Sequence, residues 1–466
     1  MTMPAEARFA DVAVVGAGPA GLAAAAAAAR SGALVLLIDG ASRPGGQFWR
    51  HGSAPPDRRL YHGWPTFERL RQHGAPTLLT RHHVRTVAAD GDGWSLTCVV
   101  GDEPSTSTVT TVVRARRLVL ATGAYDRQLP FPGWDLPGVM AGGGVQALLK
   151  SHGVLAGRSV VVAGSGPFLL PVAAGLLAVG ARVSLVAEAN SPAGITRHPR
   201  AVASAGARLR EGLGYAARLA RHRTPYRPRH AVVQALGTDR LDAVLVARLD
   251  RHGRIRAGTF RTVACDLLAI GWGFTPQLEL FLQLGCATAV GADGSLVVKA
   301  DATQATSVAR VWAAGESTGV GGADLAVVEG EIAGRAAAGA PVPPALIARR
   351  TSLRRFADAL HAVHPVPRYL VDDLPGTVLA CRCEEVPVRA VREAVHDLGA
   401  TEARTVKMLT RTGMGWCQGR VCGFAAATVT AHACGRRTSE PDLRAFAERP
   451  LAAPTTLGQL AREEPR

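Results

Sequence analysis

The sequence contains few aromatic residues and very few lysines. Aromatic residues make up 5% of the 466 residues, and lysine occurs only at Lys150, Lys299 and Lys407. The net charge of +16 therefore comes almost entirely from arginine. Because no run of five or more like charges occurs, the charge indicates a solvated basic surface and disfavours a nucleic-acid partner. A peripheral association with a membrane stays open.

The sequence also lacks uninterrupted apolar segments long enough to span a membrane. Two uncharged runs, at 12–29 and 160–180, are each divided by a glycine turn. A strand, a turn and a helix explain each run better than one spanning helix. The N-terminus lacks the pattern of a signal peptide, and eight cysteines are too few for a disulfide scaffold of this size. We therefore expect a cytoplasmic protein with reduced thiols.

A redox-active Cys-x-x-Cys pair is missing from residues 1–380. Cys98, Cys265 and Cys286 are isolated, which is typical of small buried core residues. The densest basic stretch, 218–230, is interrupted by two prolines and predicts a surface loop, with contact to an anionic partner as the alternative. The absence of the cysteine pair disfavours a dithiol reductase.

A glycine-rich turn stands near the start of the chain, between a predicted strand at 11–15 and a predicted helix at 22–30. Gly16, Gly18 and Gly21 have the spacing of a dinucleotide-binding turn, and Asp39 follows 23 residues after Gly16. The first glycine permits the tight turn, the second lets the backbone approach a pyrophosphate, and the third permits close packing of helix and strand. The free N–H groups of the helix attract phosphates, and Asp39 can accept hydrogen bonds from a ribose.

Two distant segments, 121–123 and 314–316, end predicted strands in the same manner. With the turn at 45–47, they resemble the flavoproteins that contain two dinucleotide-binding domains, over residues 8 to about 340. That resemblance implies FAD as the cofactor. Glu316 departs from the aspartate that is usual there but keeps the carboxylate. The predicted FAD-binding residues are Gly16, Gly18, Pro19, Ala20, Gly21, Asp39, Gly46, Gln47, Thr122, Gly123, Gly315 and Glu316.

A second turn of the same kind lies at 164–169, but its third glycine is replaced by Leu169. A branched side chain there would move the helix away from the strand or crowd a pyrophosphate. Glu188 could hold a ribose diol and would repel a 2′-phosphate. Gly164, Gly166 and Glu188 therefore leave two alternatives: a site for NAD or another adenine nucleotide, or a retained fold whose pocket is empty.

Four of the eight cysteines fall into a C-x-C and a C-x4-C step separated by 33 residues: Cys381, Cys383, Cys417 and Cys422. Four thiolates suit a [2Fe–2S] cluster or structural zinc. Zinc more often uses C-x2-C steps, so the pattern favours the cluster. Arg382, Arg420 and Lys407 are near in sequence and can offset its negative charge. Cys434 is left over as a free thiol.

The segments Cys381–Glu385 and Gly415–Cys422 resemble the bacterioferritin-associated-ferredoxin-like [2Fe–2S] domain. A flavoprotein followed by this domain is similar to the large flavin subunits of heteromeric amino-acid dehydrogenases, namely opine oxidases, hydroxyproline or proline dehydrogenases, and hydrogen cyanide synthase. The resemblance implies an electron-transfer subunit with two partners: a D-amino-acid-oxidase-like flavin subunit, and a small ferredoxin-like subunit. The alternatives are a self-sufficient NAD(P)H-dependent reductase and a zinc-stabilised structural subunit. No catalytic acid–base pair can be assigned, because His51 and His62 fit structural or solvated roles better.

The predicted fold class is α/β, with two Rossmann-like dinucleotide-binding domains of the pyridine nucleotide-disulfide oxidoreductase type and a small C-terminal iron–sulfur module. The predicted divisions of the chain are an FAD-binding part at 8–125, a second dinucleotide-binding domain at 126–264, a second FAD-binding part at 265–340, a linker helix at 341–375, a [2Fe–2S] domain at 376–435 and a polar tail at 436–466.

Overall fold

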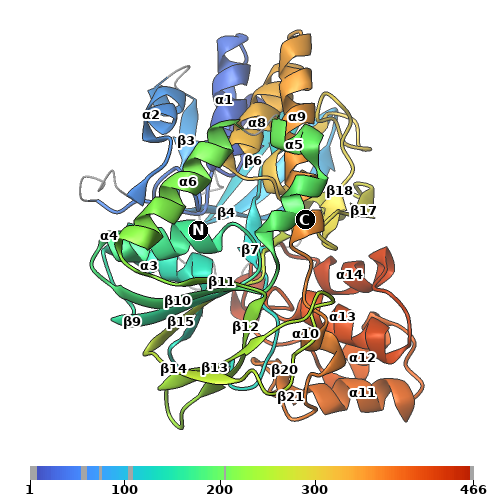
Figure 1. Ribbon diagram of the computed structural model, residues 1–466. Coiled ribbons are helices and arrows are strands. Elements are labelled where there is room, and N and C mark those ends of the chain that lie inside the picture. Colours follow the sequence, from blue (N-terminus) through green and yellow to red (C-terminus); the bar gives the residue numbers. More distant parts are fainter. Residues whose placement is uncertain (1–7, 54–59, 73–75, 103–108, 204–205, 462–466) are drawn as a thin grey trace.

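The computed structural model describes residues 8–53, 60–72, 76–102, 109–203 and 206–461. The end of the predicted polar tail, from residue 462 onward, lies outside these residues. A mixed sheet, a parallel sheet and a helical C-terminal module pack together (Figure 1). This arrangement confirms the predicted α/β class.

The first sheet has seven strands in the order β3-β2-β1-β6-β5-β4, with β19 also paired to β6. The strands β4, β5 and β6 pair with one another as an antiparallel meander. Successive side chains of a strand point to opposite faces of the sheet. The apolar side chains on one face pack against α1 (Pro19–Arg30) and α8 (Ala323–Ala337). The strands are β1 (Arg8–Val15), β2 (Val35–Ile38), β3 (Thr77–Leu79), β4 (His82–Asp90), β5 (Gly93–Val100), β6 (Val109–Leu120) and β19 (Val311–Ala313).

The helices α1 and α8 pack closely because glycines face the backbone of the partner helix. A Cβ atom at Gly330 would lie 2.0 Å from the carbonyl oxygen of Ala20, and one at Gly334 would lie 2.1 Å from that of Ala24. Side chains at either position would separate the helices. Both contacts lie in the first two turns of α1, so they fix the helix that follows the first glycine turn.

The second sheet is parallel throughout, in the order β11-β10-β9-β15-β8. The predicted surface loop at 218–230 is wrong, because α6 continues to Arg221 and Tyr226–Pro228 form the edge strand β11. The second FAD-binding part was predicted to begin at residue 265. Because β15 pairs with β9, residues up to Gly271 belong to the second sheet instead. The elements are β8 (Val139–Ala141), α3 (Gly142–His152), β9 (Ser159–Gly164), α4 (Leu169–Ala178), β10 (Arg182–Glu188), η2 (Pro192–Arg197), α5 (Pro199–Ala203), α6 (Gly206–Arg221), β11 (Tyr226–Pro228) and β15 (Leu267–Gly271).

Short elements join the two sheets and cover their free faces. The strand β7 (Ala124–Asp126) follows β6 and pairs with β16 (Phe274–Pro276), which follows β15. An antiparallel sheet covers the other face of the second parallel sheet. The remaining elements of the body are α2 (Trp64–Gln72), β12 (His230–Leu236), β13 (Ala243–Arg248), β14 (Arg261–Ala264), α7 (Glu279–Gln283), β17 (Thr288–Val290), β18 (Leu296–Val298), η3 (Gly315–Thr318) and α9 (Pro344–Val363).

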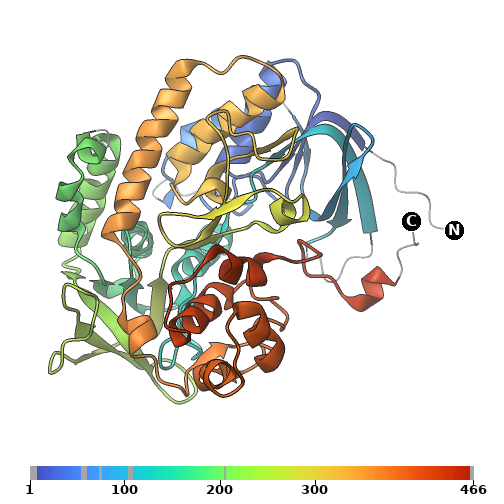
Figure 2. The ribbon, with the colours of Figure 1, turned by 90° about the vertical axis from the view of Figure 1, so that its right-hand side faces the viewer.

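The C-terminal module lies against both sheets and shares two hydrophobic cores with them. Its apolar residues pack on the strands around β12 and β13, and also on α7 and the first sheet. Figure 2 shows the module, in orange and red, beside the yellow segment that carries β17 and β18. Its elements are α10 (Tyr369–Asp372), β20 (Leu379–Cys381), β21 (Val386–Pro387), α11 (Val388–His396), α12 (Ala403–Thr410), α13 (Gly423–Ala433), α14 (Glu440–Ala447) and α15 (Leu457–Leu460).

The segment predicted as a polar tail contains the helix α14. Leu443 and Phe446 are 6% and 3% exposed, so one side of this helix belongs to the core. Two apolar residues on one side of a short helix were too weak a pattern to predict it.

Across the described part of the chain, no helix has both the length and the apolarity required to cross a membrane.

Candidate functional site

The first glycine turn forms a tight cradle at the N-terminus of α1. Gly16 has a φ of +101°, and a Cβ atom at Gly21 would lie 1.6 Å from the carbonyl oxygen of Gly16. Pro19 begins α1, and among the described residues no side chain caps that end of the helix. The predicted residue Gly46 lies over the turn, because its Cβ atom would come within 2.7 Å of the Cα atom of Gly18. The turn thus offers backbone N–H groups to a phosphate.

Asp39 lies at the end of β2, beside this turn. Its carboxylate accepts hydrogen bonds from the backbone N–H groups of Ala17 and Ala41, the second at 2.7 Å. Burial raises the pKa of Asp39, and those two N–H groups oppose the rise. Asp39 as a whole residue is half-buried, so it is less covered than a fully buried acid. Gln47 is engaged differently, accepting a hydrogen bond of 3.1 Å from Arg50.

The predicted third segment comes to the same edge of the sheet. Gly315, at the end of β19, faces the start of α1, since its Cβ atom would lie 2.9 Å from that of Ala20. Burial raises the pKa of the neighbouring Glu316 to about 7. From the adjacent strand, the Thr122 hydroxyl donates a hydrogen bond of 2.6 Å to Gln277, and Gly123 has a φ of +77°. The predicted FAD-binding segments therefore converge on one edge.

Glu329 supports this edge of the sheet, and its role was not predicted from the sequence. The carboxylate is fully buried, accepts a hydrogen bond of 3.1 Å from the Gly315 N–H group, and lies 2.6 Å from Arg354 and 3.4 Å from Arg350. Arg354 also donates to the Gly319 carbonyl oxygen at 2.7 Å. The sequence signal that could have identified it is the position of Glu329 within the mainly apolar stretch 325–333. An acid in such a stretch is expected to be buried, and buried acids are usually paired with a cation.

The second glycine turn keeps the geometry of the first despite its missing glycine. Gly164 has a φ of +137°, and its Cβ atom would lie 1.8 Å from the carbonyl oxygen of Gly271. Leu169 is 1% exposed and packs toward Gly271, where a Cβ atom would lie 3.3 Å from the leucine side chain. A glycine on the neighbouring strand thus makes room for the leucine, and the helix stays in place.

The acid of the second turn is covered by the chain itself. Glu188 is 1% exposed and accepts hydrogen bonds from the N–H groups of Gly166 at 2.9 Å and Asn190 at 2.8 Å. His364, just after α9, lies 3.3 Å from the same carboxylate. The Asn190 side chain also donates to the Pro365 carbonyl oxygen at 2.9 Å. Unlike Asp39, Glu188 is closed to a ribose in this structure.

The four cysteines of the two short motifs come together at one end of the module. Cys381 ends β20, Cys422 precedes α13, and both are buried, whereas Cys417 is half-buried and Cys383 is exposed. A hydrogen bond from Cys422 lowers the pKa of Cys417 to about 5, with the N–H groups of Val421 and Gly419 adding to the effect.

A hydrogen bond with Cys422 also lowers the pKa of Cys381 to about 6, helped by the N–H group of Gly413. Cys383 contacts Cys417, and a Cβ atom at Gly415 would lie 2.3 Å from that of Cys383. These pairwise contacts bring together four thiols and backbone N–H groups of the kind that a [2Fe–2S] cluster uses, although no three potential ligands in the described part of the chain are grouped around a single metal position. The fifth thiol of this region, Cys434, points instead toward the Ala400 carbonyl oxygen.

The loop between Cys417 and Cys422 is tied to the flavoprotein body by a buried group of charges. Arg420 lies 3.0 Å from Glu279 and donates a hydrogen bond of 3.0 Å to the Tyr125 hydroxyl. Arg449 lies 2.8 Å from Glu279 and donates to the Gln418 carbonyl oxygen at 2.6 Å. Because β7 directly follows Thr122-Gly123, Tyr125 connects the predicted flavin edge to the cysteine loop.

A second contact of this kind involves Arg127. The guanidinium is buried, lies 2.5 Å from Asp293 and stacks over the Phe424 ring at 4.1 Å from its centroid. Phe424 comes two residues after Cys422, so the start of α13 is fixed to the body as well.

Both histidines near the predicted flavin edge have structural surroundings. The Nδ1 atom of His51 donates a hydrogen bond of 2.8 Å to the Trp49 carbonyl oxygen, and the ring contacts those of Trp64 and Phe67. His62 lies 4.0 Å from Glu211. Neither arrangement supplies an acid–base pair for substrate chemistry.

Comparison with known proteins adds the family. Residues 10–330 match the pyridine nucleotide-disulphide oxidoreductase family, and residues 379–430 match the BFD-like [2Fe-2S] binding domain. An opine oxidase subunit of Rhizobium meliloti is 34% identical, covering 97% of this chain and 98% of that protein. Hydrogen cyanide synthase subunit HcnB of Pseudomonas protegens is 34% identical, covering 91% and 92%. The crystal structure of L-proline dehydrogenase from P. horikoshii shares the fold, with a TM-score of 0.72 at 22% identity, over 99% of this chain and 81% of that one.

Proposed function

The chain belongs to the pyridine nucleotide-disulphide oxidoreductase family, and from that premise we propose that it is the electron-transfer subunit of a multi-subunit amino-acid or imino-acid dehydrogenase. It is an FAD-dependent oxidoreductase with a C-terminal BFD-like domain. The substrate is of the opine, hydroxyproline or proline type. FAD, when bound, exchanges electron pairs, whereas a [2Fe–2S] cluster exchanges single electrons.

The contact between Tyr125 and Arg420 carries this proposal. The first residue follows the predicted flavin edge, and the second lies between two of the predicted cluster ligands. This contact supports the proposal, because it joins the strand that follows the predicted flavin edge to the loop between two predicted cluster ligands. The exposed side chains of Cys383 and Trp416, the latter 63% exposed, give the module an outer edge at which an electron carrier can dock.

The substrate chemistry is assigned to a partner. The described residues offer no acid–base pair at the flavin edge, since His51 and His62 are engaged elsewhere. A D-amino-acid-oxidase-like flavin subunit oxidises the C–N bond of the substrate, and a small ferredoxin-like subunit completes the complex. The two relatives are themselves named as subunits, one of opine oxidase and one of hydrogen cyanide synthase, which supports a multi-subunit assembly.

A self-sufficient NAD(P)H-dependent reductase is the second candidate. Its support is the turn geometry at Gly164, which is intact. The contact of His364 with Glu188 weighs against it, because the ribose-binding acid is covered. The first function is therefore the better supported of the two.

The test is to purify the chain alone and together with its co-purifying proteins from the native host. We expect flavin and iron–sulfur spectra in both preparations and amino-acid dehydrogenation only in the complex. Substantial dehydrogenation by the isolated chain would contradict the proposal. Bleaching of the flavin by NADH under anaerobic conditions would instead favour the reductase.

A further inference from the structure

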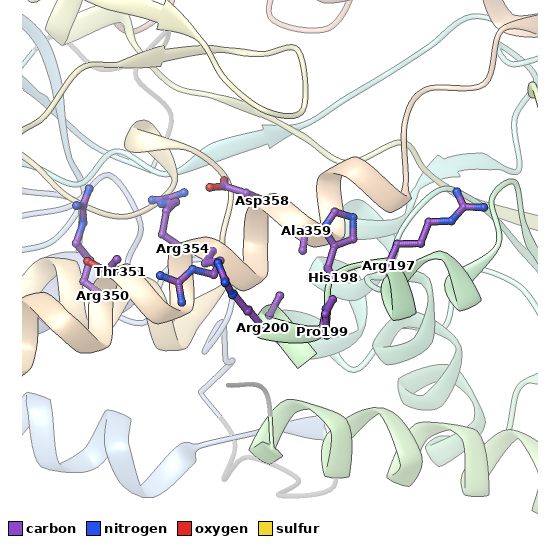
Figure 3. A pocket seen from close by; sticks show the side chains of 11 residues that line it. Arg197, His198, Pro199, Arg200, Arg350, Thr351, Arg354, Asp358 and Ala359 are labelled. Atoms are coloured by element: carbon purple, nitrogen blue, oxygen red, sulfur yellow. The ribbon is translucent and has the colours of Figure 1, made fainter. Parts of the chain in front are cut away.

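A pocket with a volume of about 710 Å³ opens between α9 on one side and η2 and α5 on the other (Figure 3). The volume lies within the range typical of small-molecule sites, roughly 300–1,000 Å³. None of the residues predicted to bind FAD, a second nucleotide or a cluster lines it. The lining residues, called the arginine pocket below, are Arg197, His198, Pro199, Arg200, Ala201, Arg350, Thr351, Arg354, Arg355, Asp358 and Ala359.

The charges of the arginine pocket are unbalanced. Five arginines line it against one acid, Asp358. Arg350 and Arg354 share the buried carboxylate of Glu329 behind the wall. Within the described ranges, the other three arginines of the pocket form no ion pair with an acid. Figure 3 shows Arg200 reaching from α5 toward α9, from which Arg350 and Arg354 project.

We propose that the arginine pocket binds a small organic anion that carries two or more phosphate or carboxylate groups. Guanidinium groups form paired hydrogen bonds with both kinds of anion. The pocket also has apolar wall atoms, contributed by Pro199, Ala201 and Ala359. Such a wall gives the carbon skeleton of an organic ligand a surface that an inorganic ion would leave unused.

The arginine pocket lies next to the predicted flavin edge and to the second glycine turn, but it shares no predicted binding residue with either. Through Arg354, the helix α9 holds the Thr318 hydroxyl at 3.0 Å, next to the predicted flavin edge. At its other end, α9 leads to His364, which covers Glu188. A ligand between α5 and α9 therefore leaves the flavin in place, and its binding is measurable as a process separate from the redox function.

The experiment uses the full-length holoprotein and isothermal titration calorimetry. ATP and pyrophosphate are the phosphate probes, and citrate is the carboxylate probe. The double variant R200A/R355A removes two arginines that form no ion pair with an acid among the described residues, and R349A, an exposed arginine on α9 outside the lining, is the matched control. We expect at least one probe to bind the wild type and R349A equally, and to bind the double variant about tenfold more weakly or worse.

The outcomes are separable from those of the proposed function, because flavin content and the iron–sulfur spectrum serve as folding controls. No binding of any probe would overturn the proposal. Equal binding by the double variant would also overturn it, and would place the ligand outside the arginine pocket. Loss of partner association in the double variant, without any anion binding, would overturn it too and make the pocket an interface with another protein.

Discussion

Arg420 donates a hydrogen bond of 3.0 Å to the hydroxyl of Tyr125, and so joins the loop between two predicted cluster ligands to the strand that leaves the predicted flavin edge. The same arginine lies 3.0 Å from Glu279, which also holds Arg449. One buried carboxylate therefore organises the junction between the body and the module.

Replacing Glu279 with glutamine should destabilise this junction. The change leaves two buried guanidinium groups without a counter-charge, a situation that costs about 3–5 kcal/mol. Denaturant unfolding measures the loss. The matched control is E448Q, because Glu448 is 54% exposed and its pair with Arg444 contributes at most about 1 kcal/mol. Equal stabilities of E279Q and E448Q would refute the structural role of Glu279.

Serine at Cys381 or Cys422 should abolish the iron–sulfur spectrum and leave FAD bound. Both thiols are buried in the contact group of four cysteines, whereas Cys434 points away from it. C434S is therefore the control and should keep its iron and acid-labile sulfide. Metal analysis that finds zinc without sulfide in the wild type would rule out the cluster.

Alanine at Gly21 should prevent FAD binding. Its Cβ atom would lie 1.6 Å from the Gly16 carbonyl oxygen, and backbone atoms cannot move aside easily. In contrast, G212A adds a methyl group to open space in α6 and should stabilise the protein by up to about 1 kcal/mol. Flavin absorbance after desalting measures the first effect, and denaturant unfolding measures the second. A G21A protein with a full complement of flavin would show that the cofactor lies elsewhere.

Glu316 should make the stability of the apoprotein depend on pH between about 4.5 and 7. Its folded-state pKa is raised from 4.5 to about 7, so folding favours the protonated form. The contribution is therefore complete below pH 4.5 and is lost as the pH rises through 7, by on the order of 3 kcal/mol. The E316Q variant stays neutral, so the difference in unfolding free energy between it and the wild type should change across this window. A constant difference would show that the carboxyl is not perturbed.

Alanine at His364 should open the second nucleotide site. The imidazole lies 3.3 Å from Glu188, and its removal uncovers the carboxylate for a ribose diol. Fluorescence titration with NADH should show affinity increased by about tenfold or more over the wild type. H252A, in an exposed loop, is the control and should behave as the wild type. Tight NADH binding by the wild type would contradict the closed state.

The sequence was sufficient to predict the parts of the fold that depend on local pattern. Gly16 and Gly164 stand between an apolar strand and a helix, and both turns have the expected positive φ values. The helix predicted within the linker at 341–375 corresponds to α9, because prolines bound this helix on both sides. The replacement of a glycine by Leu169 suggested a displaced helix, but the compensating residue, Gly271, is far away in sequence.

Contacts between distant segments could not be predicted in this way. Tyr125 and Arg420 are separated by 295 positions, and Glu188 and His364 by 176. Each residue alone has the pattern of an ordinary surface or strand-end residue, so no local signal marks the pairing. Tertiary packing decides which of the two predicted ribose-binding acids, Asp39 or Glu188, stays accessible. The local sequence around each acid does not predict this packing.

The two hydrophobic cores that the C-terminal module shares with the body have a consequence for dissection of the protein. Val391 and Val429 pack with residues of the second sheet, and Phe446 packs with Phe281 and the first sheet. A chain cut before residue 376 would expose these apolar surfaces and the acid Glu279 together. The flavoprotein body is therefore not a detachable unit, and a truncated version should aggregate where the intact chain remains in solution.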